Sequence, residues 1–142
     1  MAKILVVDDE RSIRNSMKEV LEFEGHVVTL AEDGETGLKE AEKEQFDLVF
    51  SDIKMPKMDG IELLAKMRQL QPSTKMILIS GHGTIETAVQ CMRNGAFDFI
   101  EKPMNLNRLL QAVKEAMSSN SAESSNLRAA ISNGVKKATG GV

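Results

Sequence analysis

Five polar residues lie at or just beyond the ends of short apolar runs in the sequence, and their types suit phosphoryl transfer. They are Asp8, Asp9, Asp52, Ser80 and Lys102. An apolar run that ends in a polar residue is typical of a buried strand in a parallel sheet, and open α/β sheets bind ligands at the carboxyl ends of their strands. Because right-handed crossovers bring those ends to one edge, the five side chains are predicted to lie together.

The three carboxylates predict a site for a divalent cation. Asp8 and Asp9 are adjacent, and at a strand end both can turn toward the same edge, where their charges repel unless a cation lies between them. With Asp52 they offer oxygen ligands and no His or Cys, which favours Mg²⁺, with Mn²⁺ as a substitute. We expect Asp9 to bind the ion directly and Asp8 to bind it through water.

Asp52 is the predicted nucleophile, and its attack on a phosphoryl group would form an acyl phosphate. We expect Lys102 to pair with Asp52 before transfer and with the phosphoryl oxygens afterwards. The Ser80 hydroxyl and the backbone N–H groups of Gly81 and Lys54 are candidate donors to those oxygens. Transfer of this kind depends mostly on positioning and charge neutralisation, which these groups could supply.

Each of these residues also has a simpler explanation when it is taken alone. Asp8 and Asp9 could cap a helix, Asp52 could cap the turn that follows it, and Ser80 and Lys102 could be ordinary loop residues. The coincidence of all of them at strand ends in one fold favours a functional site.

Five apolar runs alternate with five amphipathic segments, and these elements must position the site. The predicted strands cover residues 3–7, 27–30, 47–51, 76–79 and 97–100. Three of the predicted helices cover residues 11–24, 84–94 and 105–117. The other two begin at 33–34 and after the loop 54–60. This alternation predicts an α/β fold, with a parallel sheet covered by helices on both faces.

Composition favours one cytoplasmic domain over residues 1–118, followed by a Ser-rich linker or disordered tail over 119–142. The 21 acidic residues outnumber the 18 basic ones, and Trp and Tyr are absent, which argues against direct nucleic-acid contact. No apolar run approaches the roughly 18 residues of a membrane span, and no signal peptide is evident. Because Cys91 is the single cysteine, an internal disulfide is excluded, and we expect a packed or idle thiol in preference to a catalytic one.

The motifs resemble the receiver domain of bacterial two-component response regulators over about residues 2–118, including receivers of the nitrogen-regulator type. They are VVDDE at 6–10, DIKMP at 52–56, DG at 59–60, SGHG at 80–83 and KP at 102–103. The resemblance implies a flavodoxin-like (βα)5 three-layer sandwich with strand order 2-1-3-4-5. It also implies that a sensor histidine kinase phosphorylates Asp52, with Mg²⁺ required, and the backbone carbonyl of Lys54 is a further expected ligand of the ion.

The same resemblance implies a conformational switch. Ser80 follows the phosphoryl group inward, Phe99 rotates into the space that is vacated, and the Lys102–Pro103 peptide is cis. The surface formed by the helix after residue 84, the strand 97–100 and the helix after 105 then binds a downstream output domain or protein, or a second copy of the chain. Lys54 and His82 are expected to influence the lifetime of the acyl phosphate.

Three other functions fit the motifs less well. A flavodoxin-like electron carrier would need a phosphate-binding loop where the sequence has acidic residues. A phosphohydrolase would usually carry a second aspartate at the position of Lys54, so we expect no turnover of external substrates, only the chain's own phosphotransfer and dephosphorylation. A receiver-like adaptor that works without phosphorylation would usually lack Asp9, Asp52 or Lys102, all of which are present.

Overall fold

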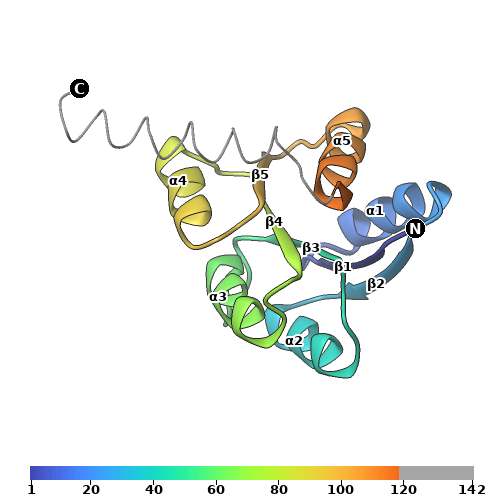
Figure 1. Cartoon of the computed structure of the whole chain (residues 1–142). Coiled ribbons are helices and arrows are strands. Elements are labelled where there is room, and N and C mark those ends of the chain that lie inside the picture. The colour runs from blue at the N-terminus through green and yellow to red at the C-terminus, as the bar shows by residue number, and fades with distance from the viewer. Residues whose placement is uncertain (119–142) are drawn as a thin grey trace.

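The computed structural model describes residues 1–118, in which five strands alternate with five helices (Figure 1). The elements are β1 (Lys3–Val7), α1 (Arg11–Phe23), β2 (Val27–Ala31), α2 (Gly34–Lys43), β3 (Leu48–Asp52), α3 (Gly60–Leu70), β4 (Lys75–Ser80), α4 (Ile85–Arg93), β5 (Asp98–Glu101) and α5 (Leu106–Met117). The predicted linker over 119–142 lies outside the described residues. No helix in the described part of the chain is long and apolar enough to cross a membrane.

The strands form one parallel sheet in the order β2-β1-β3-β4-β5, as predicted. Helices α1 and α5 cover one face of the sheet, and α2, α3 and α4 cover the other (Figure 1). The central strand β3 is buried along its whole length. This three-layer arrangement places the carboxyl ends of β1, β3 and β4 side by side.

Two apolar cores lie on the two faces of the sheet, because successive strand residues point to opposite sides. Beneath α1 and α5, the members include Ile4, Val6, Met17, Leu21, Phe50, Ile77, Ile79, Leu109 and Val113. Beneath α2, α3 and α4, they include Leu5, Val7, Phe46, Val49, Leu63, Leu64, Met67, Met76 and Leu78. The near-continuous apolar composition of β1, β3 and β4 follows from burial on both faces.

Side-chain caps fix the starts of four helices. The caps are Asp33 on α2, Asp59 on α3, Thr84 on α4 and Asn105 on α5, and each accepts a hydrogen bond from the backbone N–H three residues later. The predicted starts of α2, α4 and α5 are thereby confirmed. Helix α1 differs, because its cap residue Glu10 makes no side-chain cap hydrogen bond.

The inner face of α4 was predicted only in part. Helical periodicity groups Ile85 with the other apolar residues of this helix, but Ile85 is 84% exposed, and Cys91 is the buried residue. The helix packs against β5, which is an edge strand of the sheet. Burial, with a contribution from Asp59, raises the pKa of the Cys91 thiol to about 11, which fits the predicted packed thiol.

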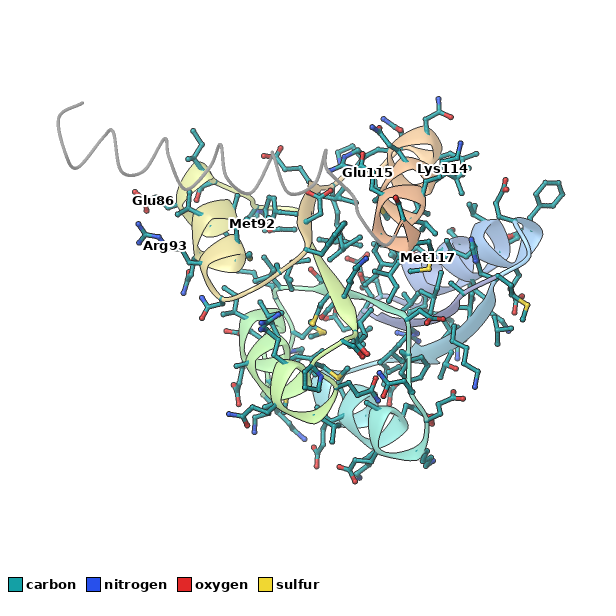
Figure 2. All side chains as sticks on the ribbon, in the orientation of Figure 1. Glu86, Met92, Arg93, Lys114, Glu115 and Met117 are labelled. Atoms are coloured by element: carbon teal, nitrogen blue, oxygen red, sulfur yellow. The ribbon has the colours of Figure 1, made fainter. Side chains whose placement is uncertain are left out.

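Helix α5 buries the middle of its apolar stripe but not the ends. Leu109 and Val113 face the core together with Ala112 and Ala116, whereas Leu106 and Met117, at the two ends of the helix, are exposed. The outer sides of α4 and α5 carry charged side chains, among them Glu86, Arg93 and Lys114 (Figure 2). These two helices therefore present mixed apolar and charged surfaces to solvent.

Candidate functional site

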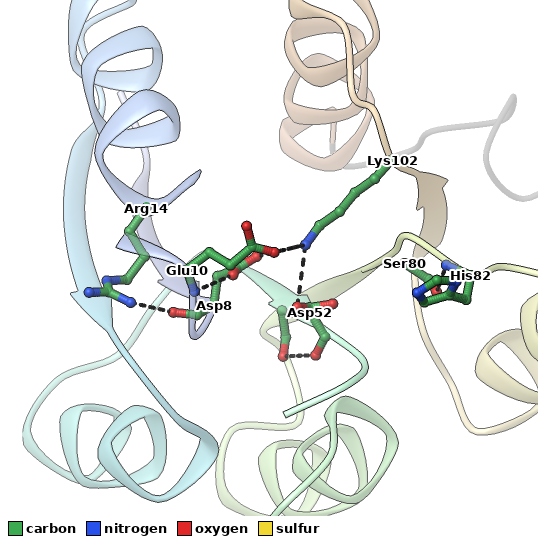
Figure 3. Close-up of polar contacts among 8 residues, drawn as sticks. Asp8, Glu10, Arg14, Asp52, Ser80, His82 and Lys102 are labelled. Atoms are coloured by element: carbon green, nitrogen blue, oxygen red, sulfur yellow. Dashed lines mark hydrogen bonds and ion pairs between the residues drawn. The ribbon is translucent and has the colours of Figure 1, made fainter. Parts of the chain in front are cut away.

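The predicted site residues gather at the carboxyl edge of the sheet. Asp52 is the last residue of β3, Ser80 is the last residue of β4, and Asp8 directly follows β1. Val7 pairs with Ser51 in the sheet, so Asp8 and Asp52 are the next residues on neighbouring strands. Lys102 follows β5 and reaches back over the edge toward both carboxylates (Figure 3).

Lys102 links the two buried aspartates. The Nζ atom of Lys102 lies 3.3 Å from Oδ2 of Asp8, 3.3 Å from Oδ2 of Asp52 and 3.7 Å from Oε1 of Glu10. The side chains of Asp8 and Asp52 are 2% and 8% exposed, and that of Lys102 is 17% exposed. The expected Lys102–Asp52 pair is therefore present, and the lysine is shared with Asp8, a contact that was not predicted.

The charges at this edge are not balanced by the lysine alone. Burial raises the pKa of Asp52, the nearby Asp8 and Asp9 raise it further, and Lys102 works against both. Burial tends to lower the pKa of Lys102, but the carboxylates of Asp8 and Asp52 outweigh it, so the pKa of the ammonium is raised. The lysine therefore stays protonated among several carboxylates, and a further cation would stabilise their ionised forms.

Three carboxylates lie close enough together to hold such a cation. One oxygen each from Asp8, Asp9 and Glu10 lies within 4.8 Å of the others, with Asp8 buried and the other two exposed. These oxygen donors, open to solvent on one side, fit Mg²⁺ or Mn²⁺, which keep several waters. The expected trio of Asp8, Asp9 and Asp52 is only partly assembled, because this group contains Glu10 in place of Asp52.

The acidic loop after β1 has a defined conformation. Oδ1 of Asp8 accepts a hydrogen bond of 2.8 Å from the backbone N–H of Glu10. Nη1 of Arg14, in α1, donates a 2.7 Å hydrogen bond to the backbone carbonyl of Asp8 (Figure 3). Sequence reasoning gave no role to Glu10 or Arg14. The adjacency of Glu10 to the two aspartates was a signal that could have identified it.

The chain also turns tightly after Asp52. The backbone N–H of Gly60 donates to the carbonyl of Ile53 over 2.8 Å, and a Cβ on Gly60 would collide with the carbonyl oxygen of Asp52. Only glycine therefore fits where α3 begins. Lys54 lies in the intervening loop and is exposed, which leaves its side chain open to solvent near the site.

The remaining predicted residues flank the site. Ser80 is buried, and its hydroxyl oxygen accepts a 3.1 Å hydrogen bond from the backbone N–H of His82, an exposed residue (Figure 3). Phe99 is half-buried, and a Cβ on Gly83 would lie 2.7 Å from its Cζ. The Lys102–Pro103 peptide is cis, as the resemblance implies.

Solved structures share the fold of this chain. A CheY-like receiver domain protein from Methanospirillum hungatei is 40% identical, with a TM-score of 0.81 over 87% of this chain and 98% of that chain. The receiver domain of NtrX from Brucella abortus is 41% identical, with a TM-score of 0.78 over 82% of this chain and 98% of that chain. Both are receiver domains of about the size of residues 1–118.

Curated relatives are longer. The C4-dicarboxylate transport transcriptional regulatory protein DctD of Rhizobium meliloti is 39% identical over 113 residues, which are 80% of this chain and 25% of DctD. The nitrogen assimilation regulatory protein NtrX of Azorhizobium caulinodans is 40% identical over 116 residues, 80% of this chain and 26% of that protein. The chain thus spans about a quarter of the length of these relatives. Residues 4–114 match the family described as the response regulator receiver domain, and the chain belongs to this family of signalling domains, which are phosphorylated on aspartate.

Proposed function

We propose that this chain is phosphorylated on Asp52 by the phosphohistidine of a sensor histidine kinase. The observation that carries the proposal is the placement of Lys102, whose ammonium lies 3.3 Å from both Asp52 and Asp8, beside the acidic cluster. This geometry puts a nucleophilic carboxylate, a fixed positive charge and oxygen ligands at one partly open edge. These are the requirements of phosphoryl transfer.

In the proposed step, an Oδ atom of Asp52 attacks the phosphorus in line with the bond to the histidine nitrogen. A P–O bond forms, the P–N bond breaks, and the imidazole leaves after taking up a proton from solvent. Lys102 neutralises charge on the phosphoryl oxygens. Asp9, with Asp8 and the backbone carbonyl of Lys54, would hold Mg²⁺ or Mn²⁺, which supplies further positive charge to those oxygens.

A pocket next to Lys102 gives the donor protein a place to dock. It has a volume of about 560 Å³ and combines apolar and small polar side chains of α1 with the segment after β5. The lining includes Ser12, Ile13, Ser16, Met17, Pro103 and Met104. A histidine on the donor's surface could reach Asp52 from this side while its neighbours contact the pocket.

Phosphorylation is proposed to change the surface formed by α4, β5 and α5. The Ser80 hydroxyl accepts from His82, so its own proton remains able to bond a phosphoryl oxygen. Movement of Ser80 and Phe99 would then pass the change to this surface, which would bind an output domain, a partner protein or a second copy of the chain. Residues 1–118 would be the receiver, and 119–142 would link it to its output.

Lys54 and His82 are proposed to set the lifetime of the acyl phosphate. Both side chains are exposed near the site, where they can affect the approach of water. The chain would catalyse only its own phosphorylation and dephosphorylation. Measuring the dephosphorylation rate of Lys54→Ala tests this role, and a rate equal to that of the wild type would refute it.

The decisive experiment is intact-mass measurement after incubation with acetyl phosphate, with Mg²⁺ or with chelator. We expect a gain of one phosphoryl group in the wild type with Mg²⁺, and no gain in Asp52→Asn. Asp47→Asn is the matched control, because Asp47 is an exposed aspartate just before the opposite end of the same strand. No gain in the wild type would favour an adaptor that works without phosphorylation.

A further inference from the structure

Helix α1 begins without the side-chain cap that the other described helices have. Its cap residue, Glu10, makes no side-chain cap hydrogen bond, and its first turn holds no acidic residue. The first turn instead includes a basic residue, Arg11. Because the acidic loop leads directly into this helix, some other contact must fix the loop relative to the sheet.

Arg14 supplies that contact at both ends of the loop. Its guanidinium donates a 2.7 Å hydrogen bond to the backbone carbonyl of Asp8, and its backbone N–H donates to the carbonyl of Glu10 over 3.1 Å. Asp8 Oδ1 in turn accepts from the N–H of Glu10 over 2.8 Å. The three hydrogen bonds join the end of β1 to the first turns of α1, and Figure 3 shows the two that Asp8 makes with Arg14 and Glu10. The directions of all three carboxylates in the cluster depend on this loop.

We propose that Arg14 is a positioning residue for the cation site, acting through the carbonyl of Asp8 and not through its charge. The proposal rests on the proposed function, because it takes Asp8 and Asp9 to be ligands of Mg²⁺. Groups that orient metal ligands usually affect metal affinity strongly even though they do not touch the ion.

Charge and positioning predict opposite results for this arginine. A guanidinium close to an acidic cluster repels a divalent cation, so removal of its charge should tighten binding if charge were its only influence. Removal of an orienting hydrogen bond should weaken binding. The sign of the change in Mg²⁺ affinity therefore separates the two roles.

The experiment is titration calorimetry of the whole chain with MgCl₂, using the wild type, Arg14→Gln and Arg11→Gln. Arg11 is the matched control, because it is an exposed arginine one turn away whose side chain makes no hydrogen bond or ion pair within residues 1–118. We expect Arg14→Gln to weaken Mg²⁺ binding about tenfold. Arg11→Gln should leave it unchanged or tighten it by up to about threefold. Circular dichroism checks that each variant is folded.

Unchanged or tighter binding by Arg14→Gln would overturn the proposal, as would equal weakening by both variants. If Arg14→Gln does not fold, Arg14→Lys decides, because lysine keeps the charge but has a shorter reach and no guanidinium. Weaker binding by the lysine variant supports positioning, and unchanged binding overturns it. A wild type that binds no Mg²⁺ would refute the cation site of the proposed function itself, whereas a wild type that binds Mg²⁺ with no effect of Arg14 would refute this inference alone.

Discussion

Removal of the Arg108 guanidinium should destabilise the fold by about 2–3 kcal/mol, because it leaves the buried carboxylate of Asp98 without its cation. Nη2 of Arg108 lies 3.0 Å from Oδ2 of Asp98, whose side chain is 2% exposed. The same nitrogen contacts the carbonyl of Phe99, and Oδ1 of Asp98 accepts from the Phe99 N–H over 2.8 Å. The pair thus joins α5 to the backbone of the edge strand β5 at Phe99, which lies three residues before Lys102.

The size of the effect follows from the burial of the two partners. Breaking a fully buried ion pair costs about 3–5 kcal/mol. The Arg108 side chain is 32% exposed, so water can solvate part of the orphaned charge and the expected cost is smaller, at about 2–3 kcal/mol. We would use Arg108→Met, which keeps an unbranched apolar stem. Asp98→Asn keeps an acceptor for the Phe99 N–H and should cost about 1 kcal/mol.

A double-mutant cycle tests this reasoning. Arg108→Met combined with Asp98→Asn should cost less than the sum of the single changes by about 1–2 kcal/mol, because the double variant has no orphaned charge. The free energy of unfolding would be measured by urea titration followed by far-UV circular dichroism, since the chain has no Trp or Tyr for fluorescence. If the costs of the two single changes add up to the cost of the double change within about 0.5 kcal/mol, Arg108 and Asp98 are not energetically coupled. This result would refute the argument that Arg108 stabilises the buried charge of Asp98.

Three further substitutions test the close packing at Gly60, the hydrogen bond of His26 and the cap of α5. Gly60→Ala should cost about 2 kcal/mol or more by urea titration, because its Cβ collides with the carbonyl of Asp52, and an unchanged midpoint would contradict this. His26 Nδ1 accepts the Ala2 N–H over 3.0 Å, and burial, followed by the positive amino terminus, lowers the pKa of His26. The neutral His26 side chain should therefore stabilise the fold fully above about pH 6.5, and this contribution should be lost as the pH falls below that value. The variant His26→Ala should show a flatter dependence of the unfolding free energy on pH in this range. Asn105→Ala should cost about 1 kcal/mol, because Oδ1 of Asn105 caps α5, and a loss near zero would argue against the cap.

The sheet could be predicted because its strands are short, apolar and separated by clear turns. Their order came from the resemblance, since hydrophobic periodicity does not say which strands are neighbours. The predicted strand ends were off by one residue in places: β3 was expected over 47–51 and runs from Leu48 to Asp52. Asp52 belongs to the strand because it pairs with Ile79, so the predicted nucleophile is held by the ladder and not by the loop.

Contacts made by side chains across the sheet were harder to predict. The motifs indicated that Lys102 would meet Asp52, but no spacing indicates that it also contacts Asp8, which lies 94 residues away. Arg14 reads in the sequence as an ordinary polar position on a helix, and its bond to the Asp8 carbonyl depends on how α1 packs. The exposure of Ile85 has a similar cause, since periodicity marks an apolar face without showing where the sheet beneath it ends.

The strand order explains why residue 102 needs a long, positively charged side chain to reach Asp52. Strand β4 separates β5 from β3, and neighbouring strands are about 4.8 Å apart, so a group that follows β5 must cross nearly 10 Å to reach Asp52. The extended stem of Lys102 can cross most of this distance, provided that nothing large stands at the end of β4. The residues there are Ser80 and Gly81, and a Cβ on Gly81 would already be in van der Waals contact with Cδ of Lys102 at 3.8 Å. The strand order therefore requires both small residues at the end of β4 and a long side chain after β5, because β4 lies between Lys102 and Asp52.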